Sequence, residues 1–517
     1  MYIPRSTAAS LLTALSQTPS HVSRQNSVTN PPLRSLSITT TPNGFTSPPR
    51  GWNSFGIQAN PGTDSSFVFN QEDVLQQCDV MASNPGLKAN GFEYCSLDSG
   101  WSVPDHGDDN GRLIPDPSLF PGIATGEMAN HLHSEGLKLG VYVVPGGFLQ
   151  DVNKTISNTN IQIKEVCSGD NGLDRCNWDY EADGVQQWHD SVVAQFASWG
   201  VDFIKLDFVT PGSPDNGVNL PANQSLAVVA YHNAISRSGR QMRLDISWKL
   251  GRDPADYGIW TSNADSFRTD QDINNSGSNS TMFTAWSTVQ RAIDNYRQYI
   301  TLHTAQDEVL SIYPDMDNMF VANEQSISGV TDEERRSILS HWMAAGSNLI
   351  LGSDLSNIDD FGQSLLSNTF AFSTIADFAA KFPMRPRNPG TGAGDAKQLQ
   401  AWIAGPSTTS GHTTAIVLLA NYGPDLGQGG FGTSLADSQT ISISLAELGI
   451  ADSQRNDTWA AKDVWNNEDL GVLSKDAISA NVQVNSSNVK VRIDRGDQLS
   501  ADLAEGESVV VLLTKTD

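Results

Sequence analysis

The sequence predicts an α/β fold class, with a parallel (β/α)8 (TIM) barrel followed by a C-terminal antiparallel β-sandwich domain. Three observations support this prediction. Between residues 47 and 390, eight short apolar runs alternate with amphipathic, helix-like stretches. After residue 390, short alternating runs continue between turn residues without long helices. Several of the eight runs end in an aspartate, which is typical of the rim that carries the active site of a barrel enzyme.

The eight apolar runs are expected to be the barrel strands. They lie at residues 51–56, 94–101, 138–147, 203–209, 242–248, 265–272, 310–317 and 348–355. Helical patterns such as QEDVLQQCDVMASN and GVQQWHDSVVAQFASWG separate most of them. Because parallel strands in one sheet are connected through helices, this alternation predicts a catalytic barrel over residues 47–390.

The pattern changes over residues 391–517. The runs are now LQAWIAGP, TTAIVLLANYG, QTISISLAELG, NVQVNSSNVKVRI and ESVVVLLT, divided by Gly, Asn and Asp turns. Several of them alternate between apolar and polar residues, as half-buried strands do. We therefore expect an antiparallel β-sandwich in this region.

Residues 1–46 are rich in Ser, Thr, Pro and Asn and show no sustained hydrophobic period. Such a composition predicts a disordered, mobile N-terminal leader. Its first twenty residues, MYIPRSTAASLLTALSQTPS, contain no apolar segment of the kind that a secretory signal carries.

The composition excludes several classes of function. The 517 residues contain 32 Lys and Arg against 58 Asp and Glu, a formal charge of −26 at pH 7. This balance repels phosphate backbones and anionic membrane surfaces, so nucleic acid is not expected as a partner. No run of about 18 apolar residues occurs, so no membrane-spanning segment is expected. With 38% hydrophobic and 17% charged residues, the chain is expected to fold.

The four cysteines are too few for a disulfide-held fold and too scattered for a zinc site. Cys167 and Cys176 close a short loop and form either a bridge or two free thiols, while Cys78 and Cys95 could pair across consecutive elements. Asn-x-Ser/Thr triplets, which mildly favour an exported protein, occur at Asn153, Asn223, Asn274, Asn279, Asn456 and Asn485. We expect an extracellular protein, although the sequence shows no clear signal peptide.

Aspartates mark the ends of six apolar runs: Asp98, Asp207, Asp245, Asp272, Asp315 and Asp354. Parallel strands in a barrel bring such residues to one rim, although aspartates here can also be N-caps of the next helices. Capping fits Asp207 less well, because Lys205 precedes it on the same face of the strand and the apolar run continues after it. Arg268 stands four residues before Asp272, a second pairing of cation and carboxylate.

No metal or cofactor site accompanies these carboxylates in the sequence. The nine histidines do not cluster, and no Gly-rich phosphate loop or Ser nucleophile motif occurs. Aromatic residues near the run ends could instead pack against a pyranose ring or against the core: Trp52, Phe55, Trp101, Tyr142, Trp248 and Tyr313. Paired carboxylates with aromatic neighbours suit the cleavage of glycosidic bonds, so a saccharide substrate and no cofactor are expected.

A series of motifs resembles glycoside hydrolase family 27, which contains α-galactosidases and α-N-acetylgalactosaminidases. In order, these are PPRGWNSFG, YCSLDSGW, HSEGLKLGVY, WGVDFIKLDF, FRTDQD, YPDMD and HWMAAGSNLILGSDL. The C-terminal stretches AWIAGP, AIVLLANYG, ISLAELGI and DVWNNEDLG resemble the second domain of that family. The similarity spans about Pro48 to Thr514 and implies a barrel with an antiparallel C-terminal domain.

The resemblance implies roles for individual residues. Asp207 corresponds to the nucleophile and Asp272 to the general acid/base, and a slip of the alignment would move the second role to Asp270. The sugar contacts it implies are Phe55, Asp98, Trp101, Tyr142, Lys205, Ser247, Arg268 and Asp315. A retaining mechanism needs an ionised nucleophile, a protonated acid with a raised pKa, and carboxyl groups about 5–5.5 Å apart.

Several positions depart from the α-galactosidase pattern of the family. Ser99 replaces a second Asp after Asp98, Phe55 stands where a Trp is expected, and Ser247 replaces a Glu. Leu250 stands where the N-acetylgalactosaminidases carry a small Ala. The third strand reads YVVPGG instead of the family pattern Tyr-Ala/Ser-Asp. Because losing a hydroxyl-binding carboxylate changes sugar selectivity strongly, these departures leave the sugar open among the substrates of the family.

Three hypotheses follow. The first is a retaining exo-α-galactosidase that hydrolyses terminal α-D-galactosyl residues. The second keeps this mechanism for another sugar, as a β-L-arabinopyranosidase, an α-N-acetylgalactosaminidase or an isomalto-dextranase. The third is a carbohydrate-binding protein without catalysis. The oligomeric state is left open, a homo-oligomer included.

Overall fold

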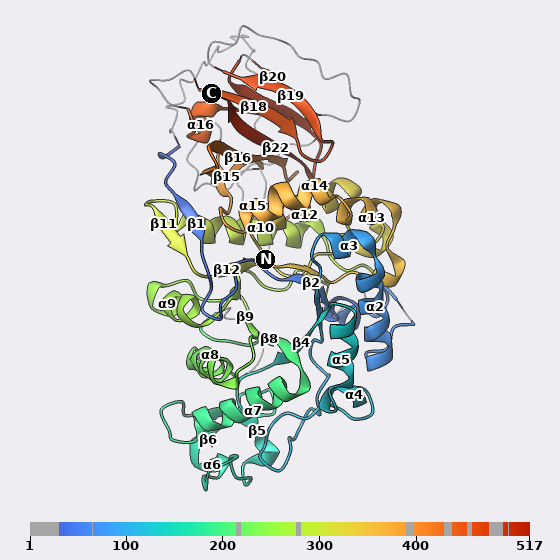
Figure 1. The fold of residues 1–517 in the computed structure, drawn as a ribbon, viewed down its shortest axis with the longest axis vertical. Helices are drawn as coiled ribbons and strands as arrows, with labels where there is room; N and C mark the ends of the chain where they lie inside the picture. Colours follow the sequence, from blue (N-terminus) through green and yellow to red (C-terminus); the bar gives the residue numbers. More distant parts are fainter. Residues whose placement is uncertain are drawn as a thin grey trace, which may run out of the picture.

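Eight parallel strands form a curled sheet at the centre of the larger part of the molecule (Figure 1). In the order of the sheet they are β12 (Tyr313–Asp315), β10 (Ser266–Arg268), β9 (Arg243–Ile246), β8 (Val201–Leu206), β4 (Lys138–Val143), β3 (Tyr94–Ser96), β2 (Arg50–Asn53) and β13 (Leu349–Leu351). The two outermost strands, β12 and β13, are joined by backbone hydrogen bonds in and beside them. Asn348 N donates to Pro314 O at 3.1 Å, and Met319 N donates to Ile350 O at 2.7 Å. Each predicted run overlaps one of these strands, which confirms the fold class.

The computed structural model describes residues 30–64, 66–212, 219–275, 281–388, 398–428, 437–451, 457–474, 490–494 and 496–516. The sequons at Asn279, Asn456 and Asn485 lie outside these residues. Within them, no helix combines the length and the apolar character needed to cross a membrane.

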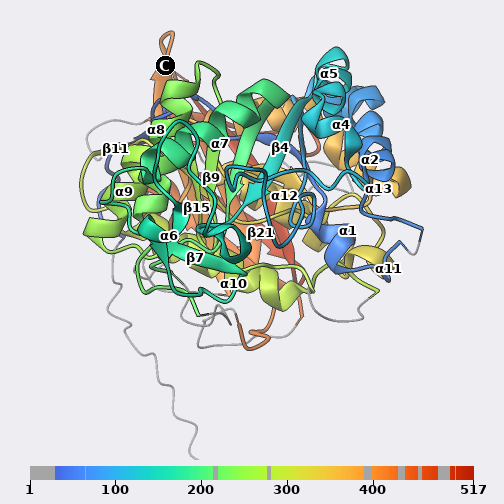
Figure 2. The same cartoon turned by 90° about the horizontal axis from the view of Figure 1, so that it is seen from below.

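Helices follow most barrel strands and cover the outer face of the sheet (Figures 1 and 2). The longer ones are α2 (Gln71–Ser83), α5 (Glu127–Ser134), α7 (Val185–Trp199), α8 (Leu226–Ser238), α9 (Pro254–Asn263), α10 (Trp286–Thr301), α12 (Asp332–Ala344) and α13 (Asp360–Leu366). Short helices and turns are α1 (Phe55–Ala59), α3 (Pro85–Ala89), α4 (Pro121–Ala124), α6 (Ile163–Val166), α11 (Gln325–Ser328), α14 (Thr369–Ala371), α15 (Asp377–Ala379), α16 (Leu445–Leu448), η1 (Leu149–Asp151), η2 (Leu355–Asn357) and η3 (Phe372–Ala376).

Local sequence signals start and stop these helices. Helix α12 begins with a capping box, in which the Thr331 hydroxyl accepts from Glu334 N and the Glu334 carboxylate accepts from Thr331 N. Helix α7 ends at Gly200, whose φ of 86° suits glycine. Asp354 accepts from Ser356 N at the start of η2, so capping is its role.

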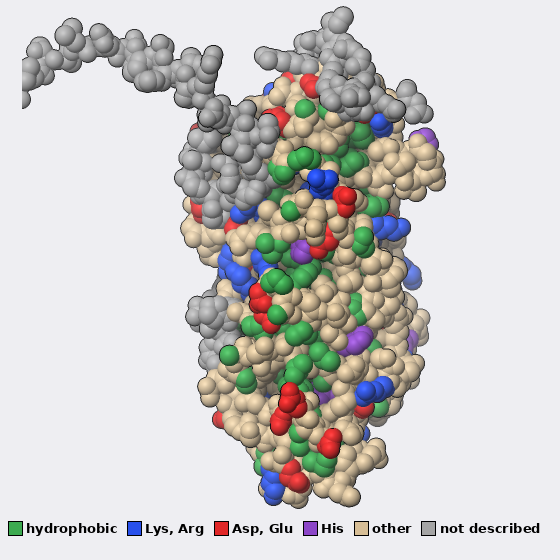
Figure 3. All heavy atoms as spheres, turned by 90° about the vertical axis from the view of Figure 1, so that its left-hand side faces the viewer, with side chains coloured by type: hydrophobic (Ala, Val, Ile, Leu, Met, Phe, Trp, Pro, Cys, Tyr) green, Lys and Arg blue, Asp and Glu red, His purple; other side chains and the backbone are tan. Residues whose placement is uncertain are grey.

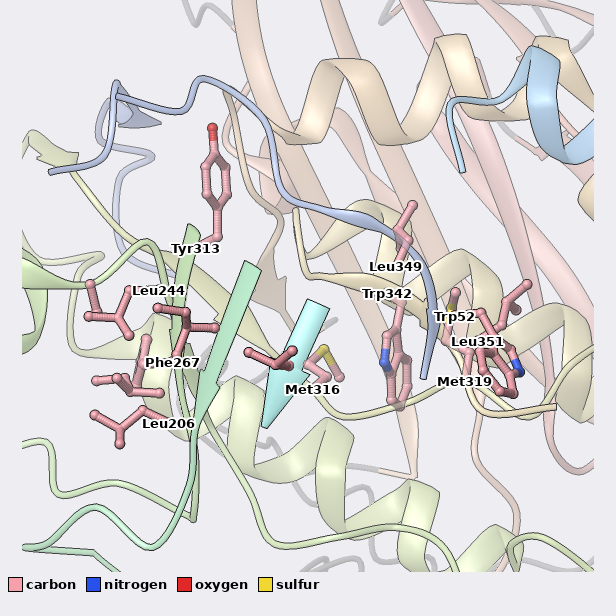
Figure 4. Packing of buried hydrophobic residues seen from close by; sticks show 14 of the residues in the cluster. Trp52, Leu206, Leu244, Phe267, Tyr313, Met316, Met319, Trp342, Leu349 and Leu351 are labelled. Carbon is pink, nitrogen blue, oxygen red and sulfur yellow. The ribbon is translucent and has the colours of Figure 1, made fainter. Parts of the chain in front are cut away.

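Apolar residues between strands and helices form the main core. Figure 4 shows Leu206, Leu244 and Phe267 projecting from the neighbouring strands β8, β9 and β10, while Trp52 and Trp342 pack with the residues around β13. These side chains are essentially excluded from water. Burying a large apolar side chain contributes about 1.5–3 kcal/mol, so this layer holds the strands, and hence their C-terminal ends, in fixed positions.

Two antiparallel sheets form the C-terminal region, as the sequence predicts. One sheet has the order β14 (Arg385–Arg387), β15 (Leu399–Thr409), β16 (His412–Asn421), β22 (Glu507–Thr516), β18 (Thr458–Asp463) and β19 (Glu468–Leu473). The other has the order β17 (Gln439–Ser444), β21 (Gln498–Leu503) and β20 (Val491–Asp494). Residues of both sheets, such as Ile403, Val417, Ile443 and Leu499, share one core. Strand β14 pairs with β15, so this sheet begins before the predicted boundary at residue 390.

The expectation of a mobile leader is wrong for residues 30–46. Strand β1 (Leu36–Ile38) pairs in parallel with β11 (Glu308–Leu310), and the side chains of Leu36 and Ile38 are buried. The apolar–polar–apolar pattern at residues 36–38 is too short to indicate a strand within a Ser- and Pro-rich stretch. Residues 1–29 lie outside the described residues.

Both cysteine pairs form disulfides, with Cα–Cα distances of 5.9 Å for Cys78–Cys95 and 5.5 Å for Cys167–Cys176. The first joins α2 to β3. The second lies in a small antiparallel sheet of β5 (Gly147–Phe148), β6 (Cys167–Ser168) and β7 (Arg175–Trp178), which the sequence did not predict. Of the two possibilities for Cys167 and Cys176, a bridge or two free thiols, the structure has the bridge.

The surface carries charges of both signs. On the face shown in Figure 3, acidic, basic and hydrophobic side chains are interspersed among polar groups, and no single patch of one sign dominates.

Candidate active site

Asp98, Asp207 and Asp272 follow three strands of the same parallel sheet at their C-terminal ends. Asp98 comes two residues after β3, Asp207 directly after β8, and Asp272 four residues after β10. Because parallel strands run in one direction, these carboxylates share one rim of the barrel.

Asp207 is buried, and both of its carboxylate oxygens accept hydrogen bonds. Tyr142 Oη donates to Oδ2 at 3.0 Å, and Phe208 N donates to Oδ1 at 2.8 Å. Burial raises the pKa of the Tyr142 hydroxyl well above its ordinary value, and the Asp207 charge raises that pKa further. Tyr142 therefore stays protonated and acts as a donor to the Asp207 carboxylate.

Lys205 lies between Asp98 and two aromatic rings. Its Nζ donates to Asp98 Oδ2 at 2.8 Å and lies 5.6 Å from the ring centre of Phe55 and 5.7 Å from that of Tyr142. Asn53 Nδ2 also donates to Asp98 Oδ2, at 3.2 Å. Burial opposes the charge on Lys205, but the surrounding carboxylates outweigh it and raise the pKa of the ammonium. Lys205 is thus a permanent cation at the rim.

Asp272 is held by a buried arginine. Arg268 Nη2 donates to Asp272 Oδ1 at 2.7 Å, and Arg268 Nη1 lies 3.2 Å from Asp317 Oδ1. Asp317 also accepts from Ile273 N at 2.7 Å, which fixes the backbone next to Asp272. The Arg268 side chain is 2% exposed and that of Asp272 27% exposed. The carboxylate therefore remains accessible while its partner is anchored.

The pKa directions differ from the expected ones. Burial raises the pKa of Asp207, and the Lys205 cation offsets this only in part. Burial also acts to raise the pKa of Asp272, but Arg268 and Lys205 together hold that pKa below its ordinary value. The expectation of a raised pKa at Asp272 is therefore wrong for the free protein. The reason is geometric: Lys205 is hydrogen-bonded to Asp98, whereas Arg268 is hydrogen-bonded to Asp272 itself.

Asp270, the alternative to Asp272, faces helix α10. Its carboxylate accepts from Arg291 Nε at 2.8 Å and from Asn295 Nδ2 at 2.9 Å, and it is 1% exposed. Arg291 also donates to the backbone oxygen of Asp272 at 2.7 Å. Asp270 thus helps to connect the strand end to a helix, and Asp272 is the more accessible of the two carboxylates.

A cavity inside the barrel is lined by unusually polar side chains. Its lining comprises Asn53, Ser96, Phe203, Lys205, Asp245, Arg268, Asp315, Asp317, Asn318, Asn348 and Ile350. Asp315 is buried here, with its Oδ1 accepting from Asp317 N and its Oδ2 4.0 Å from Arg268 Nε. Burial and the charge of Asp245 raise the pKa of Asp315 well above its ordinary value. Asp315 thus lies beside the guanidinium group that holds Asp272.

Two predicted sugar contacts, Trp101 and Ser247, are fully buried. The Trp101 ring is buried against Phe196 and Trp199, and its Nε1 donates to Tyr142 O at 2.7 Å. Trp101 thus supports the residue Tyr142, and its contact with a sugar stays a prediction. Ser247 is also buried; its N donates to Leu206 O at 2.8 Å and its O accepts from Val209 N at 3.1 Å, which keeps it next to strand β8.

Other residues of the site were not predicted from the sequence. Asn53 and Asp317 hydrogen-bond to the site as described above, and Arg291 reaches it from α10. Asp317 could have been noticed as the second aspartate of YPDMD, and Asn53 from its place at the end of β2. Arg291 gives no such signal, because a helix surface carries many arginines.

Comparisons with known proteins agree with the motif series. A family model described as alpha galactosidase A matches residues 47–162. Alpha-galactosidase 3 of Hypocrea jecorina is 48% identical over 494 residues, covering 94% of this chain and 73% of the relative. Putative alpha-galactosidase 8 of Emericella nidulans is 39% identical over 422 residues, covering 79% and 81%.

A solved structure shares the fold. The family 27 β-L-arabinopyranosidase of Geobacillus stearothermophilus superposes with a TM-score of 0.67 at 21% identity, covering 90% of this chain and 97% of that one. At this identity the likeness concerns the fold alone. The motif series, the barrel with its antiparallel C-terminal domain, and the 48% identical relative together show that the chain belongs to glycoside hydrolase family 27.

Proposed function

We propose that this protein is a retaining exo-α-galactosidase that removes terminal α-D-galactosyl residues by double displacement. The observation that carries the proposal is the pair of rim carboxylates, one hydrogen-bonded to Tyr142 and the other to Arg268. The relative with 48% identity, named an alpha-galactosidase, supports the choice of sugar.

In the first step, an Asp207 oxygen attacks the anomeric carbon, and Asp272 donates its proton to the glycosidic oxygen. The bond to the leaving sugar breaks, and an ester to Asp207 forms. The hydrogen bonds from Tyr142 and Phe208 N support the ionised carboxylate before attack and after its release. Asp272 supplies the proton that the departing alkoxide needs.

In the second step, water attacks the same carbon from the face that the leaving group has vacated. Asp272 now accepts a proton from this water, and the Asp207 ester breaks to restore the carboxylate. Two displacements at one carbon return the original anomeric configuration. We propose that Lys205, Asp98 and Arg268 contact the sugar hydroxyls, because their charged groups surround the two rim carboxylates.

The reactive form has Asp207 ionised and Asp272 protonated. Because the pKa of Asp207 is raised and that of Asp272 is lowered, this form is a minority of the free enzyme. Activity requires a protonated Asp272, so kcat/KM falls as the pH rises, and it requires an ionised Asp207, so it also falls at low pH. We therefore infer a bell-shaped profile.

A panel of nitrophenyl glycosides tests the choice of sugar. We expect release from the α-D-galactoside, with weaker release from the β-L-arabinopyranoside, which lacks the exocyclic carbon, and from the N-acetyl-α-D-galactosaminide. Preference for either of the other two glycosides contradicts the proposal and favours the same mechanism on that sugar. Release from none contradicts catalysis on these sugars altogether.

Substitutions test the two roles. Asp207→Asn is expected to lower kcat more than about a thousandfold on every substrate. Asp272→Ala is expected to lower kcat by about 10²–10⁴ for a sugar leaving group and by much less for nitrophenol, which leaves without a proton. Asp270→Asn is the matched control, since an aspartate that only supports the site affects both leaving groups equally.

The disulfides support secretion as a further part of the proposal. Two bridges connect all four cysteines, and disulfides persist in oxidising compartments. We expect the natural host to export the protein, which fractionation of culture medium and cells measures directly.

A further inference from the structure

Asp317 is a buried aspartate beside the arginine that holds Asp272. Its Oδ1 lies 3.2 Å from Arg268 Nη1, and its side chain is 7% exposed. Its Oδ2 accepts from the N–H of Ile273, the residue directly after Asp272, at 2.7 Å. Both oxygens of this carboxylate therefore face donors, and hydrogen bonds of this kind support its ionised form.

Two further contacts fix the backbone of Asp317. Its carbonyl oxygen accepts from Trp342 Nε1 in helix α12 at 2.7 Å, and its N–H donates to Asp315 Oδ1 at 2.9 Å. Its φ is 78°, a left-handed conformation that aspartate adopts more readily than most residues with a side chain. Such a conformation persists where the surrounding contacts over-determine it, so the carboxylate is held in place against Arg268.

Arg268 needs an anionic partner throughout the reaction. Its guanidinium group is always charged, and leaving a buried charge without a partner is costly. Arg268 Nη2 donates to Asp272 at 2.7 Å, but the proposed acid carries a proton, and is then uncharged, before the first displacement. In that state the carboxylate beside Arg268 Nη1, which is Asp317, remains as its partner.

Asp315 is less suited to this role. Its Oδ2 lies 4.0 Å from Arg268 Nε, and this nitrogen has no hydrogen-bond partner among the described residues. Burial and the charge of Asp245 raise the pKa of Asp315 well above its ordinary value, which favours its neutral form. Asp317 is therefore the better placed of the two carboxylates to compensate the charge of Arg268.

Asp272 and Asp317 lie beside the two terminal nitrogens of one guanidinium group, so each affects the proton of the other. Burial raises the pKa of Asp317, the Arg268 cation opposes this, and the charge of Asp272 raises it further. Because the repulsion of two like charges is reciprocal, an ionised Asp317 favours the protonated form of Asp272. The other charged or titratable groups that face these two carboxylates are Tyr142 from β4, Lys205 from β8, Asp207 at the end of β8, Arg291 from α10 and Asp315 from β12.

We infer that Asp317 is a positioning residue for the acid/base step: it stays bonded to Arg268 and to the backbone after Asp272, so that Asp272 can carry a proton while the buried arginine keeps an anionic partner. This inference rests on the proposed function. Asp317 acts through Arg268 and Ile273 and needs no contact with the sugar. The proton itself moves between Asp272, the leaving oxygen and the attacking water, as in the proposed mechanism.

The pH profile of kcat/KM on melibiose tests this role, because the glucose leaving group needs the proton of Asp272. The readout is the ratio of kcat/KM at the optimum to kcat/KM at the lowest pH measured, a ratio that does not depend on the fraction of active protein. Asp317→Asn keeps the size of the side chain and an acceptor for Ile273 N but removes the charge. We expect the ratio to fall about tenfold, because less Asp272 is protonated at the optimum, whereas activity at the lowest pH follows the ionisation of Asp207.

Three further variants keep the test decisive. Asp317→Ser also removes the charge, is expected to lower the ratio in the same way, and decides the matter if Asp317→Asn does not fold. Asp317→Glu preserves the charge and is expected to retain most of the wild-type ratio. Asp265→Asn is the matched control, because it neutralises another buried aspartate, directly before strand β10 at the opposite end from Asp272, and is expected to leave the ratio unchanged.

The outcomes are distinct. A lower ratio in Asp317→Asn or Asp317→Ser, with the ratio retained in Asp317→Glu and Asp265→Asn, supports the inference. An equal fall of kcat/KM at every pH in the two neutral variants overturns it, since Asp317 would then have a structural role alone. A ratio that falls as far in Asp317→Glu as in the neutral variants overturns it as well, since the charge would not be responsible. A wild-type protein that hydrolyses no α-galactoside overturns the proposed function, and this inference with it.

Discussion

Cations determine how the two rim carboxylates share a proton. Arg268 is bonded to Asp272 and lowers the pKa of that carboxyl, whereas Lys205 is bonded to Asp98 and leaves the pKa of Asp207 raised by burial. Arg291 adds a further positive charge near Asp272. The position of the pH optimum is therefore a property of these cations as much as of the carboxylates.

Removing the charge of Arg291 tests this relation. Arg291→Gln removes a cation that lowers the pKa of Asp272, so Asp272 keeps its proton to higher pH. We expect kcat/KM to rise at the optimum and along the alkaline limb, because more Asp272 is protonated there, and to stay unchanged at the lowest pH, where it follows the ionisation of Asp207. The measurement is the pH profile of kcat/KM on an α-galactoside.

Arg291→Lys is the matched control, because it preserves the charge and is expected to keep the wild-type profile. If both variants shift the alkaline limb equally, geometry rather than charge is responsible, and the electrostatic account of Asp272 is contradicted.

At the residue scale, the sequence located carboxylates better than it located their partners. Asp207 and Asp272 could be predicted because they follow apolar runs, and such positions meet on one rim in a parallel barrel. The packing of a side chain beyond a turn could not be predicted, as Trp101 shows: its ring packs against Phe196 and Trp199 in the core. The direct hydrogen bond between Arg268 and Asp272 could not be predicted either, and it reverses the expected direction of the Asp272 pKa shift.

At the scale of elements, the eight strands could be predicted because each is a buried run between turns or helices. Elements of two or three residues could not: β1 has two buried apolar side chains, and β5, β6 and β7 are stabilised by a disulfide as well as by pairing. Strand β1 and the residues after it nevertheless help to fix the barrel, although they are far in sequence from the strands that they contact. Thr41 and Asn43 both donate hydrogen bonds to the buried carboxylate of Asp265.

Truncation tests the contribution of this N-terminal segment. Removing residues 1–46 exposes the surface that Leu36 and Ile38 cover and leaves Asp265 without two donor residues. We expect a loss of about 4 kcal/mol of unfolding free energy, from about 2 kcal/mol for each buried side chain, and a lower thermal midpoint. Removing only residues 1–29 is the control and is expected to retain the full midpoint. Equal midpoints for the two truncations would show that residues 30–46 contribute no stability.

At the scale of the whole molecule, the sandwich packs on the barrel through a buried hydrogen-bond network. The Tyr422 hydroxyl, which follows β16, accepts from Trp402 Nε1 at 2.7 Å and lies 3.0 Å from His341 Nε2 in helix α12. The backbone oxygen of Tyr422 also accepts from Trp286 Nε1 at 2.8 Å. Burial lowers the pKa of His341 to about 4, so this histidine is neutral at the junction. The two parts therefore share polar as well as apolar contacts.

Tyr422→Phe tests the junction. It leaves the Trp402 and His341 nitrogens buried without this partner, which costs about 2 kcal/mol, and we expect a lower thermal midpoint with kcat on an α-galactoside unchanged. Tyr313→Phe is the matched control, because the Tyr313 hydroxyl is buried with no hydrogen-bond partner among the described residues. Equal midpoints for the two variants would contradict the proposed contribution of the Tyr422 hydroxyl.

The most direct measurement traps the covalent intermediate. A fluorinated α-galactoside with an activated leaving group slows the second displacement, because fluorine destabilises the cation-like transition state, and the glycosyl-enzyme accumulates. Mass spectrometry is expected to show a gain of one fluorogalactosyl unit, with the label on Asp207 after digestion, and no gain in Asp207→Asn. A label on another residue, or hydrolysis of the α-galactoside with inversion of the anomeric configuration, would contradict the account.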